Sequence, residues 1–266
     1  MSGLALALAD GAVIAKRNLI KIKRVPEILV WTTMSPIMFV LLFGYVFGSS
    51  IEIPGVNYRE YLIAGVFAQT VVFGATFTGA GLAEDMTKGI IDRFRSLPMA
   101  RSAVLVGRTA GDVFYNATSL FVMSATALVV GWRIRTSVPE AVGGFLLLLL
   151  FAYAISWIMA YVGLRVSSVE VVNNASFMVI FPLTFISNAF VASNALPGPL
   201  ETFAEWNPVS AVAQAARVAF GNTGAMPAPD VWSLAHPALY TIIWVAITLA
   251  VFIPLSVRHY VKAAAR

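Results

Sequence analysis

The sequence has no cysteine and little charge. Only 12% of its 266 residues are Asp, Glu, Lys or Arg, against about 25% in an ordinary soluble domain. The absence of cysteine excludes disulfides, thiolate metal sites and cysteine nucleophiles. The shortage of charge, together with 59% hydrophobic residues and a mean hydropathy of +0.82, excludes a soluble globular enzyme.

The sequence also lacks the motifs of several reaction classes. No G-x-x-x-x-G-K-[ST] occurs, so the chain has no P-loop of its own to hold ATP phosphates. It has no H-E-x-x-H, no G-x-S-x-G and no carboxylate cluster suited to metal-dependent transfer. The two histidines, His236 and His259, stand apart near the ends of apolar runs. We therefore predict no catalytic residue, no metal site and no cofactor bound by this chain.

Long apolar runs are what the sequence has in abundance. A helix of roughly 20 residues crosses the ~30 Å hydrocarbon core of a bilayer and satisfies its own backbone groups there. Six windows of about this length contain no charged residue: 28–47, 61–82, 113–132, 142–162, 171–191 and 239–257. We predict an all-α polytopic membrane protein with six transmembrane helices, in which residues 1–266 form a single domain.

The positive charges indicate the orientation. Most of the 18 Lys and Arg residues fall before the first span, between spans 2 and 3, and after the last span. The positive-inside rule places those segments, and with them both termini, in the cytoplasm. The net charge of +5 fits contact with anionic lipid headgroups. We expect a multi-pass protein of the cell membrane and no nucleic-acid partner.

Residues 1–27 have the pattern of an amphipathic helix. On a helical wheel Leu4, Leu8 and Leu19 share one face, while Arg17 and Lys21 lie opposite. This pattern is typical of a helix lying on the membrane surface. The alternative is a basic tail without fixed structure.

The connection after span 2 has a second amphipathic pattern, at residues 84–97. Met86, Ile90, Phe94 and Leu97 recur at helical spacing, and Pro98 ends the element. The rest of its surface carries charges of both signs, which are Glu84, Asp85, Lys88, Asp92, Arg93 and Arg95. Lipid binding stays possible, but mixed charge favours docking to another protein, because acidic residues facing anionic lipid are unfavourable.

The connection before the last span contains two short helical segments within residues 196–221. They cover 200–206 and 209–221, with Asn207 placed to cap the second and Pro208 in its first turn. Their apolar residues suggest that they dip into the outer leaflet, with Glu201, Glu205 and Arg217 facing polar surroundings or each other. A surface helical hairpin outside the bilayer is the alternative.

The spans contain small and mildly polar residues but no ionisable group except at their ends, which counts against an ion-coupled pump. Glycines such as Gly65, Gly74, Gly79 and Gly81 allow close helix packing. Polar and aromatic residues inside the spans serve either packing or a substrate path. The candidates for such a path are Gln69, Phe73, Asn173 and Asn174.

Two segments carry a resemblance to a known family. They are E-D-M-T-K-G-I-I-D-R-F-R-S-L-P-M-A-R at 84–101 and the pattern L-P…L-E-T-F-A-E-W-N-P-V-S…A-R at 196–217. In this order and position they resemble the permease subunits of type-2 ABC transporters, particularly the daunorubicin-resistance-type drug and lipid exporters of actinobacteria. The resemblance covers essentially the whole chain.

The resemblance implies roles for these segments. Residues 1–27 would be the connecting helix, 84–97 the coupling helix that enters a groove of the ATPase, and 196–221 the re-entrant extracellular helices. The ATPase-docking residues would be Glu84, Asp85, Lys88, Asp92, Arg93, Phe94 and Arg95. The extracellular gate would include Pro197, Glu201, Glu205, Asn207, Pro208 and Arg217. Two permease chains, identical or paralogous, would pair with two ATP-binding subunits that hold ATP and magnesium.

The function expected from the resemblance is export of a hydrophobic or amphipathic compound, a drug or a lipid, without enzymatic activity in this chain. Related permeases also move carbohydrate polymers, so the sequence leaves that substrate class open. A membrane-bound enzyme that modifies lipid is a further alternative, and it lacks an evident catalytic set.

Overall fold

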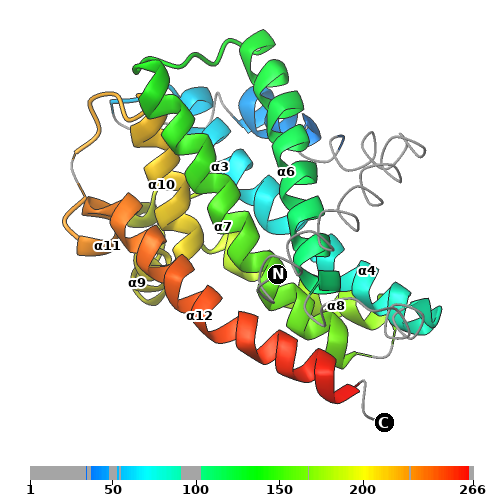
Figure 1. Ribbon diagram of the computed structural model, residues 1–266. Coiled ribbons are helices and arrows are strands. Elements are labelled where there is room, and N and C mark those ends of the chain that lie inside the picture. The colour runs from blue at the N-terminus through cyan, green and yellow to red at the C-terminus, as the bar shows by residue number, and fades with distance from the viewer. Residues whose placement is uncertain are drawn as a thin grey trace.

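A computed structural model of the chain describes residues 34, 37–47, 53, 55–90, 103–166, 168–227 and 229–263. Within these residues the chain is helical and has no β-strand, although an isolated bridge pairs Ile53 with Val56. The elements of Figure 1 are η1 (Leu42–Phe47), α3 (Tyr58–Gly74), α4 (Thr76–Thr87), α6 (Ala103–Val129), α7 (Val138–Arg165), α8 (Val169–Phe185), η2 (Ser193–Ala195), α9 (Gly198–Trp206), α10 (Pro208–Phe220), α11 (Trp232–Ala235) and α12 (Pro237–Ala263). The predicted all-α class is confirmed.

Four of the predicted spans correspond to helices long and apolar enough to cross a membrane. These are Tyr58–Thr87, Val104–Val129, Val138–Arg165 and Pro237–Val261. The predicted span at 171–191 is shorter in the structure, because α8 has 17 residues and reaches about 25 Å at 1.5 Å per residue. The first predicted span, 28–47, is helical where it is described, from residue 37 onward. The count of six spans therefore stays a prediction.

The helix of the second span continues further than expected. Helices α3 and α4 follow each other through Ala75, and α4 ends only at Thr87. Lys88 caps it, and Gly89 has a φ of +63°, a left-handed conformation that glycine adopts readily at helix ends. The prediction of one helix over 84–97 is therefore wrong at its start, because residues 84–87 are the last turn of α4 and the chain turns at Lys88–Gly89. Residues 91–97 and the predicted interfacial helix at 1–27 lie outside the described residues.

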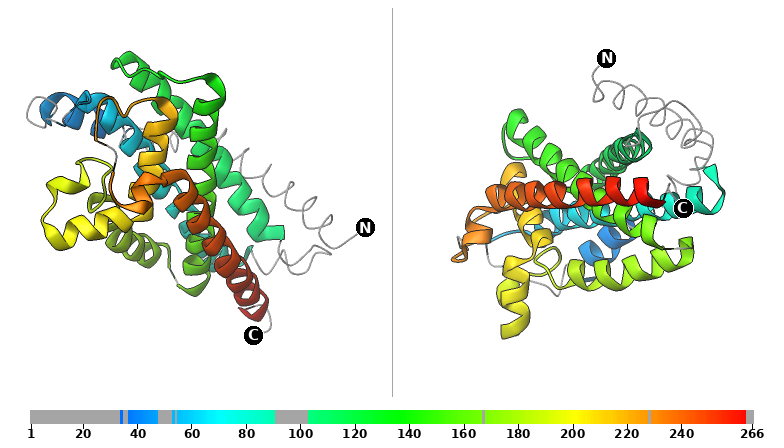
Figure 2. Two further views of the ribbon diagram at one scale, coloured as in Figure 1. Left: turned by 90° about the vertical axis from the view of Figure 1, so that its left-hand side faces the viewer. Right: turned by 60° about the horizontal axis from the view of Figure 1, so that its bottom comes forward.

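Helix α7 lies at the centre of the bundle. It packs against α3, α4, α6, α10 and α12, and Figures 1 and 2 show these helices gathered around it. Its contact with α4 is backbone to backbone. A Cβ at Gly79 would lie 2.8 Å from the carbonyl oxygen of Met159, and a Cβ at Gly163 would overlap the carbonyl of Gly79. The predicted role of the span glycines in close packing is thus confirmed.

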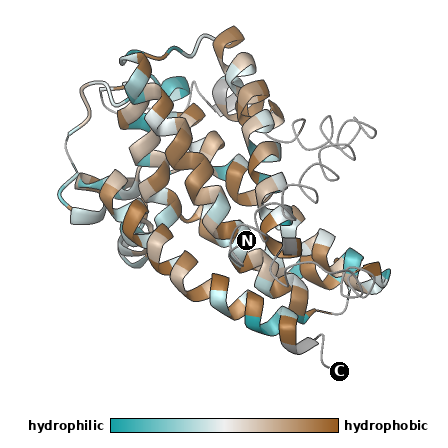
Figure 3. Cartoon of the chain, in the orientation of Figure 1, coloured by the Kyte–Doolittle hydropathy of each residue, from teal (hydrophilic) through white to brown (hydrophobic). Residues whose placement is uncertain are grey.

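The outer surface of the helices is apolar. Figure 3 shows brown residues along the long helices. Large apolar side chains such as Met178 and Phe121 are 79% and 76% exposed, which is unfavourable in water and suits lipid. Charged side chains gather at two opposite ends. We call the end where α4 stops and α6 starts the connection end, and the end that carries α9, α10 and α11 the re-entrant end (Figure 1).

Candidate functional site

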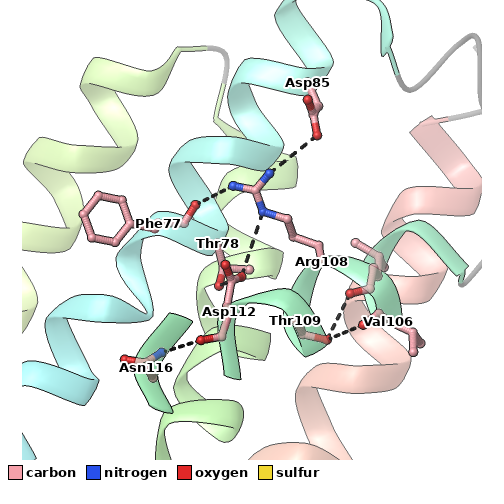
Figure 4. Close-up of polar contacts among 9 residues, drawn as sticks. Phe77, Thr78, Asp85, Val106, Arg108, Thr109, Asp112 and Asn116 are labelled. Carbon is pink, nitrogen blue, oxygen red and sulfur yellow. Dashed lines mark hydrogen bonds and ion pairs between the residues drawn. The ribbon is translucent and has the colours of Figure 1, made fainter. Parts of the chain in front are cut away.

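A buried charged cluster joins α4 to α6 at the connection end (Figure 4). Arg108 on α6 donates from Nη2 to the carbonyl oxygen of Phe77 at 3.0 Å. Its Nη1 lies 3.7 Å from Oδ2 of Asp85, and its Nε lies 3.9 Å from Oδ2 of Asp112. The three side chains are at most 14% exposed. Ion pairs this well shielded from water interact more strongly than surface pairs.

Neighbouring residues fix the geometry of this cluster. Thr78 donates to Oδ2 of Asp112 at 2.5 Å, and Nδ2 of Asn116 donates to the carbonyl of the same residue at 2.9 Å. A methyl group at Gly81 would overlap the guanidinium of Arg108. Glycine at this position therefore lets the guanidinium lie directly on the backbone of α4.

The sequence prediction missed this cluster because it started the third span at residue 113. Helix α6 begins ten residues earlier, at Ala103. The charges of Arg108 and Asp112 do not end the helix, because they pair with each other and with Asp85 on α4. Their spacing of four residues is a helical signal that was present in the sequence.

Of the predicted ATPase-docking residues, the structure describes Glu84, Asp85 and Lys88. Glu84 and Lys88 form an exposed ion pair at 2.5 Å, at the i,i+4 spacing that places two side chains on one face of a helix. Asp85, by contrast, points inward to Arg108. The other predicted docking residues, Asp92, Arg93, Phe94 and Arg95, lie outside the described residues. Their docking role stays a prediction.

The two short helices predicted before the last span are present at the re-entrant end. Asn207 caps α10 through a hydrogen bond from the backbone N–H of Val209 to its Oδ1, 2.9 Å long. Pro208 is the first residue of α10, and Pro197 precedes α9 as its N-cap. The Nδ2 of Asn207 also donates to the carbonyls of Leu183 and Ile186, at 2.7 and 2.8 Å.

Helix α10 is buried along most of its length and packs against α3, α7 and α12. Figure 1 shows α10 beside α3 and α7. This burial shows that α10 is covered by other helices of the chain, whereas most of α9 is partly or fully exposed. The depth of α9 and α10 in a membrane stays a prediction.

Arg217 on α10 is fully buried in a set of oxygen acceptors. Its Nε donates to the carbonyl of Tyr61 at 3.0 Å, and its Nη2 donates to the carbonyls of Asn188 and Ala189 at 2.7 and 3.1 Å. Its Nη1 donates to Oδ1 of Asn188 and Oε1 of Gln214 at 3.2 and 3.3 Å. Backbone and amide dipoles therefore hold this charge.

The expectation of polar surroundings for Arg217 is confirmed, whereas its alternative, pairing with Glu201 or Glu205, is not seen. None of the ion pairs among the described residues includes Arg217. Glu201 and Glu205 instead line a cavity beside α9, together with Asp230. Burial, and then the negative charges of Glu201 and Asp230, raise the pKa of Glu205 above its ordinary value.

The candidate substrate-path residues are not gathered in one place. Gln69 is buried in α3, whereas Asn173 and Asn174 are exposed on α8. Phe73 contacts α8 through Phe177, with ring centroids 6.4 Å apart. The structure thus links Phe73 to the face that carries the two asparagines but leaves Gln69 inside the bundle.

A row of stacked aromatic rings was not predicted. Neighbouring ring centroids along the row are 4.3 to 5.8 Å apart, and its members are Phe39, Phe43, Phe190, Phe185, Phe181 and Phe177. Three of these residues recur every four positions on α8, and this spacing was visible in the sequence. Offset aromatic packing of this kind holds α8 to η1 and the preceding residues.

Long apolar helices, an apolar outer surface and charge gathered at two ends define a multi-pass helical membrane protein. Residues 11–220 match the family model described as ABC-2 type transporter. The chain belongs to this family, which confirms the resemblance found in the sequence. The family implies an ATP-binding partner subunit, and its permease components are not themselves enzymes.

Curated relatives agree with this assignment. The daunorubicin resistance ABC transporter permease protein DrrB1 of Streptomyces coeruleorubidus is 33% identical over 244 residues, which cover 92% of this chain and 83% of the relative. The probable doxorubicin resistance ABC transporter permease protein DrrC of Mycobacterium tuberculosis is 24% identical over 204 residues, which cover 76% of this chain and 73% of the relative.

Proposed function

We propose that the chain is the permease subunit of an ATP-driven exporter that moves a hydrophobic or amphipathic compound, a drug or a lipid, out of the cytoplasm or the inner leaflet. A separate ATP-binding subunit would hold ATP and magnesium and supply the energy. The observation that carries this proposal is the arrangement at the connection end. There, residues 88–102 connect the end of α4 to the start of α6, and Arg108 on α6 contacts Phe77 and Asp85 on α4.

This arrangement suits the transmission of force from a docked ATPase. Residues 88–102 include Asp92, Arg93, Phe94 and Arg95, which match the docking pattern of the family. Because Arg108 contacts both Phe77 and Asp85 on α4, displacement of the docked segment would move both helices together. The distribution of Lys and Arg supports a cytoplasmic position for this end.

The exposed face of α8 supports pairing with a second permease chain, identical or paralogous. Asn173 and Asn174 are exposed there beside Phe177 and Met178, which are 57% and 79% exposed. Amide groups that face hydrocarbon lack partners, whereas amides at a helix interface can hydrogen-bond across it. A substrate path between two chains would therefore run past Asn173, Asn174 and Phe73. The complete assembly would contain two ATP-binding subunits.

Gln69 remains a candidate for the same path. It is buried, and its Oε1 has no hydrogen-bond partner in the described part of the chain. An acceptor buried without a partner is unfavourable by about 1–3 kcal/mol. Movement of α3 during transport would expose this group to a ligand that can donate a hydrogen bond.

Transport in reconstituted vesicles tests the proposal. Vesicles containing this permease and its ATP-binding subunit should move doxorubicin, or a fluorescent phospholipid, only when ATP is hydrolysed. Vesicles with the permease alone are the control and should move neither compound. ATPase binding without movement of any amphipathic probe would contradict export, and turnover of lipid by the purified permease alone would favour the enzyme alternative.

A further inference from the structure

A cavity of about 290 Å³ at the re-entrant end is lined by three carboxylates. Glu201 and Glu205 lie one turn apart on α9, and Asp230 precedes α11. None of the three forms an ion pair with another described residue. Like charges gathered around a recess raise the local concentration of cations. This acidity is local, since the chain as a whole has a net charge of +5.

Two buried amides also line the cavity. Asn188 and Gln214 are 4% and 5% exposed. Their oxygens accept hydrogen bonds from Arg217. Neither amide nitrogen donates to any described residue. These amide nitrogens are therefore available to donate to a ligand in the cavity that carries a hydrogen-bond acceptor.

The remaining lining favours an organic ligand. Ile53, Met226, Val231 and Leu234 contribute apolar side chains. No group of three His, Cys, Asp or Glu residues in the described ranges is placed to hold a metal ion. The cavity therefore offers negative charge, amide donors and an apolar surface without the dense carboxylate shell that a metal ion needs.

We propose that this cavity binds the ammonium group of an amphipathic organic cation. The ammonium would lie among Glu201, Glu205 and Asp230, an acceptor of the ligand would meet Asn188 and Gln214, and the apolar part would extend along Leu234 and Met226. Its use as the last binding site on an export path rests on the proposed function. The binding itself requires only this chain.

Equilibrium binding of a matched probe pair tests the site. Dansylcadaverine has a protonated amine on an apolar body, and its N-acetyl form lacks the charge. We expect dansylcadaverine to bind the purified permease in lipid nanodiscs saturably and at least tenfold more tightly than the acetylated form. Glu201→Gln with Glu205→Gln should weaken dansylcadaverine at least tenfold and leave the acetylated form unchanged.

Two further variants keep the test decisive. Asp230→Asn changes an exposed position and should weaken dansylcadaverine severalfold even if the α9 double variant does not fold. Glu170→Gln is the control, because Glu170 is an exposed carboxylate at the start of α8 and does not line the cavity. The dissociation constant of dansylcadaverine from the Glu170→Gln variant should match that from the wild type.

The site would be refuted by equal affinity for the two probes, by binding that does not saturate, or by unchanged binding in a folded Asp230→Asn or Glu201→Gln, Glu205→Gln variant. Size-exclusion elution and thermal midpoint identify the folded variants. Because no ATPase is present, saturable binding without ATP-driven transport would refute export and leave the site intact. Transport without charge-dependent binding would refute the site and leave export intact.

Discussion

The guanidinium carbon of Arg217 lies 3.5 Å from the centroid of the Tyr61 ring, and Nε of the same side chain donates to the carbonyl of Tyr61. The tyrosine therefore meets the cation with both its ring and its backbone. The hydroxyl of Tyr61 donates in turn to the carbonyl of Asn188 at 2.7 Å. These contacts join α3, α10 and the turn after α8 in one buried network of polar interactions.

Replacement of Arg217 by Met should therefore lower the free energy of unfolding by about 3–5 kcal/mol, since the carbonyl of Ala189 and two side-chain amide oxygens lose their donor. Arg165→Met is the matched control, because Arg165 is exposed and also contacts a tyrosine ring, with Cζ 5.0 Å from the centroid of Tyr161. The Arg165→Met change should lower the free energy of unfolding by less than about 1 kcal/mol. Thermal unfolding in detergent measures both, and equal losses would contradict the structural role of Arg217.

Gly81 and Arg108 should be energetically coupled. Gly81→Ala alone should destabilise by about 1–3 kcal/mol, because the methyl group meets the guanidinium. In an Arg108→Ala background the same change should be neutral or stabilising by up to about 1 kcal/mol, as expected for alanine in a helix. A double-mutant cycle measured by unfolding gives the coupling energy. Additive effects would show that Gly81 is not required by Arg108.

Reversing charge in the docking segment should separate the permease from its ATPase. Arg93→Glu with Arg95→Glu should abolish co-purification with the ATP-binding subunit and the stimulation of ATP hydrolysis by substrate. Arg258→Glu is the control, because Arg258 is an exposed residue near the end of α12 and outside the predicted docking helix. Normal complex formation by the double variant would show that the docking assignment is wrong.

The two roles of Asn207 can be measured separately. Asn207→Asp keeps the oxygen that caps α10 and loses the donor to Leu183 and Ile186, whereas Asn207→Ala loses both. We expect losses of about 1–3 kcal/mol for Asp and a further ~1 kcal/mol for Ala. Thermal midpoints give this order. Equal midpoints for the two variants would mean that the cap contributes nothing.

Binding of dansylcadaverine should weaken as the pH falls. The primary amine of dansylcadaverine stays protonated at neutral and acidic pH. Glu205, by contrast, loses its charge as the pH falls through its pKa. Burial and the negative charges of Glu201 and Asp230 raise this pKa above its ordinary value. Tyr61 also lines the cavity. The sign for stability is opposite: the raised pKa of Glu205 favours the folded protein at low pH, and this contribution is lost as the pH rises through that pKa. The Glu205→Gln variant should bind dansylcadaverine more weakly than the wild type at every pH. The midpoint of its curve of binding against pH should also shift.

The short helices at the re-entrant end could be predicted because their signals are local. Asn207 and Pro208 stand together at the start of α10, and Gly221, with a φ of +69°, ends it. Capping depends on residues within a few positions, so one sequence is sufficient to recognise it. The apolar runs predicted most of the long helices for the same reason.

The environment of charged residues could not be predicted, because it depends on distant partners. Arg217 and Tyr61 are separated by 156 positions, and no local pattern marks a backbone carbonyl as an acceptor. Arg108 was likewise placed in the connection between spans 2 and 3, and Asp112 at the end of a span, since their partner Asp85 belongs to another helix. Gly89 was a local signal that a helix starting at residue 84 would be interrupted. The helical spacing of Met86 and Ile90 favoured a continuous helix instead, so this signal was not used.

The backbone contact between Gly79 and Gly163 has a mechanical consequence. Side chains between two helices can yield by changing rotamer, whereas touching backbones transmit a displacement without such slack. A push on residues 91–102 would reach α4 and α6 through Arg108 and pass directly to α7, which packs against α10 and α12. A displacement that starts at the connection end would thus reach α10, beside the acidic cavity, as the motion of rigid helices rather than as a change of side-chain rotamers.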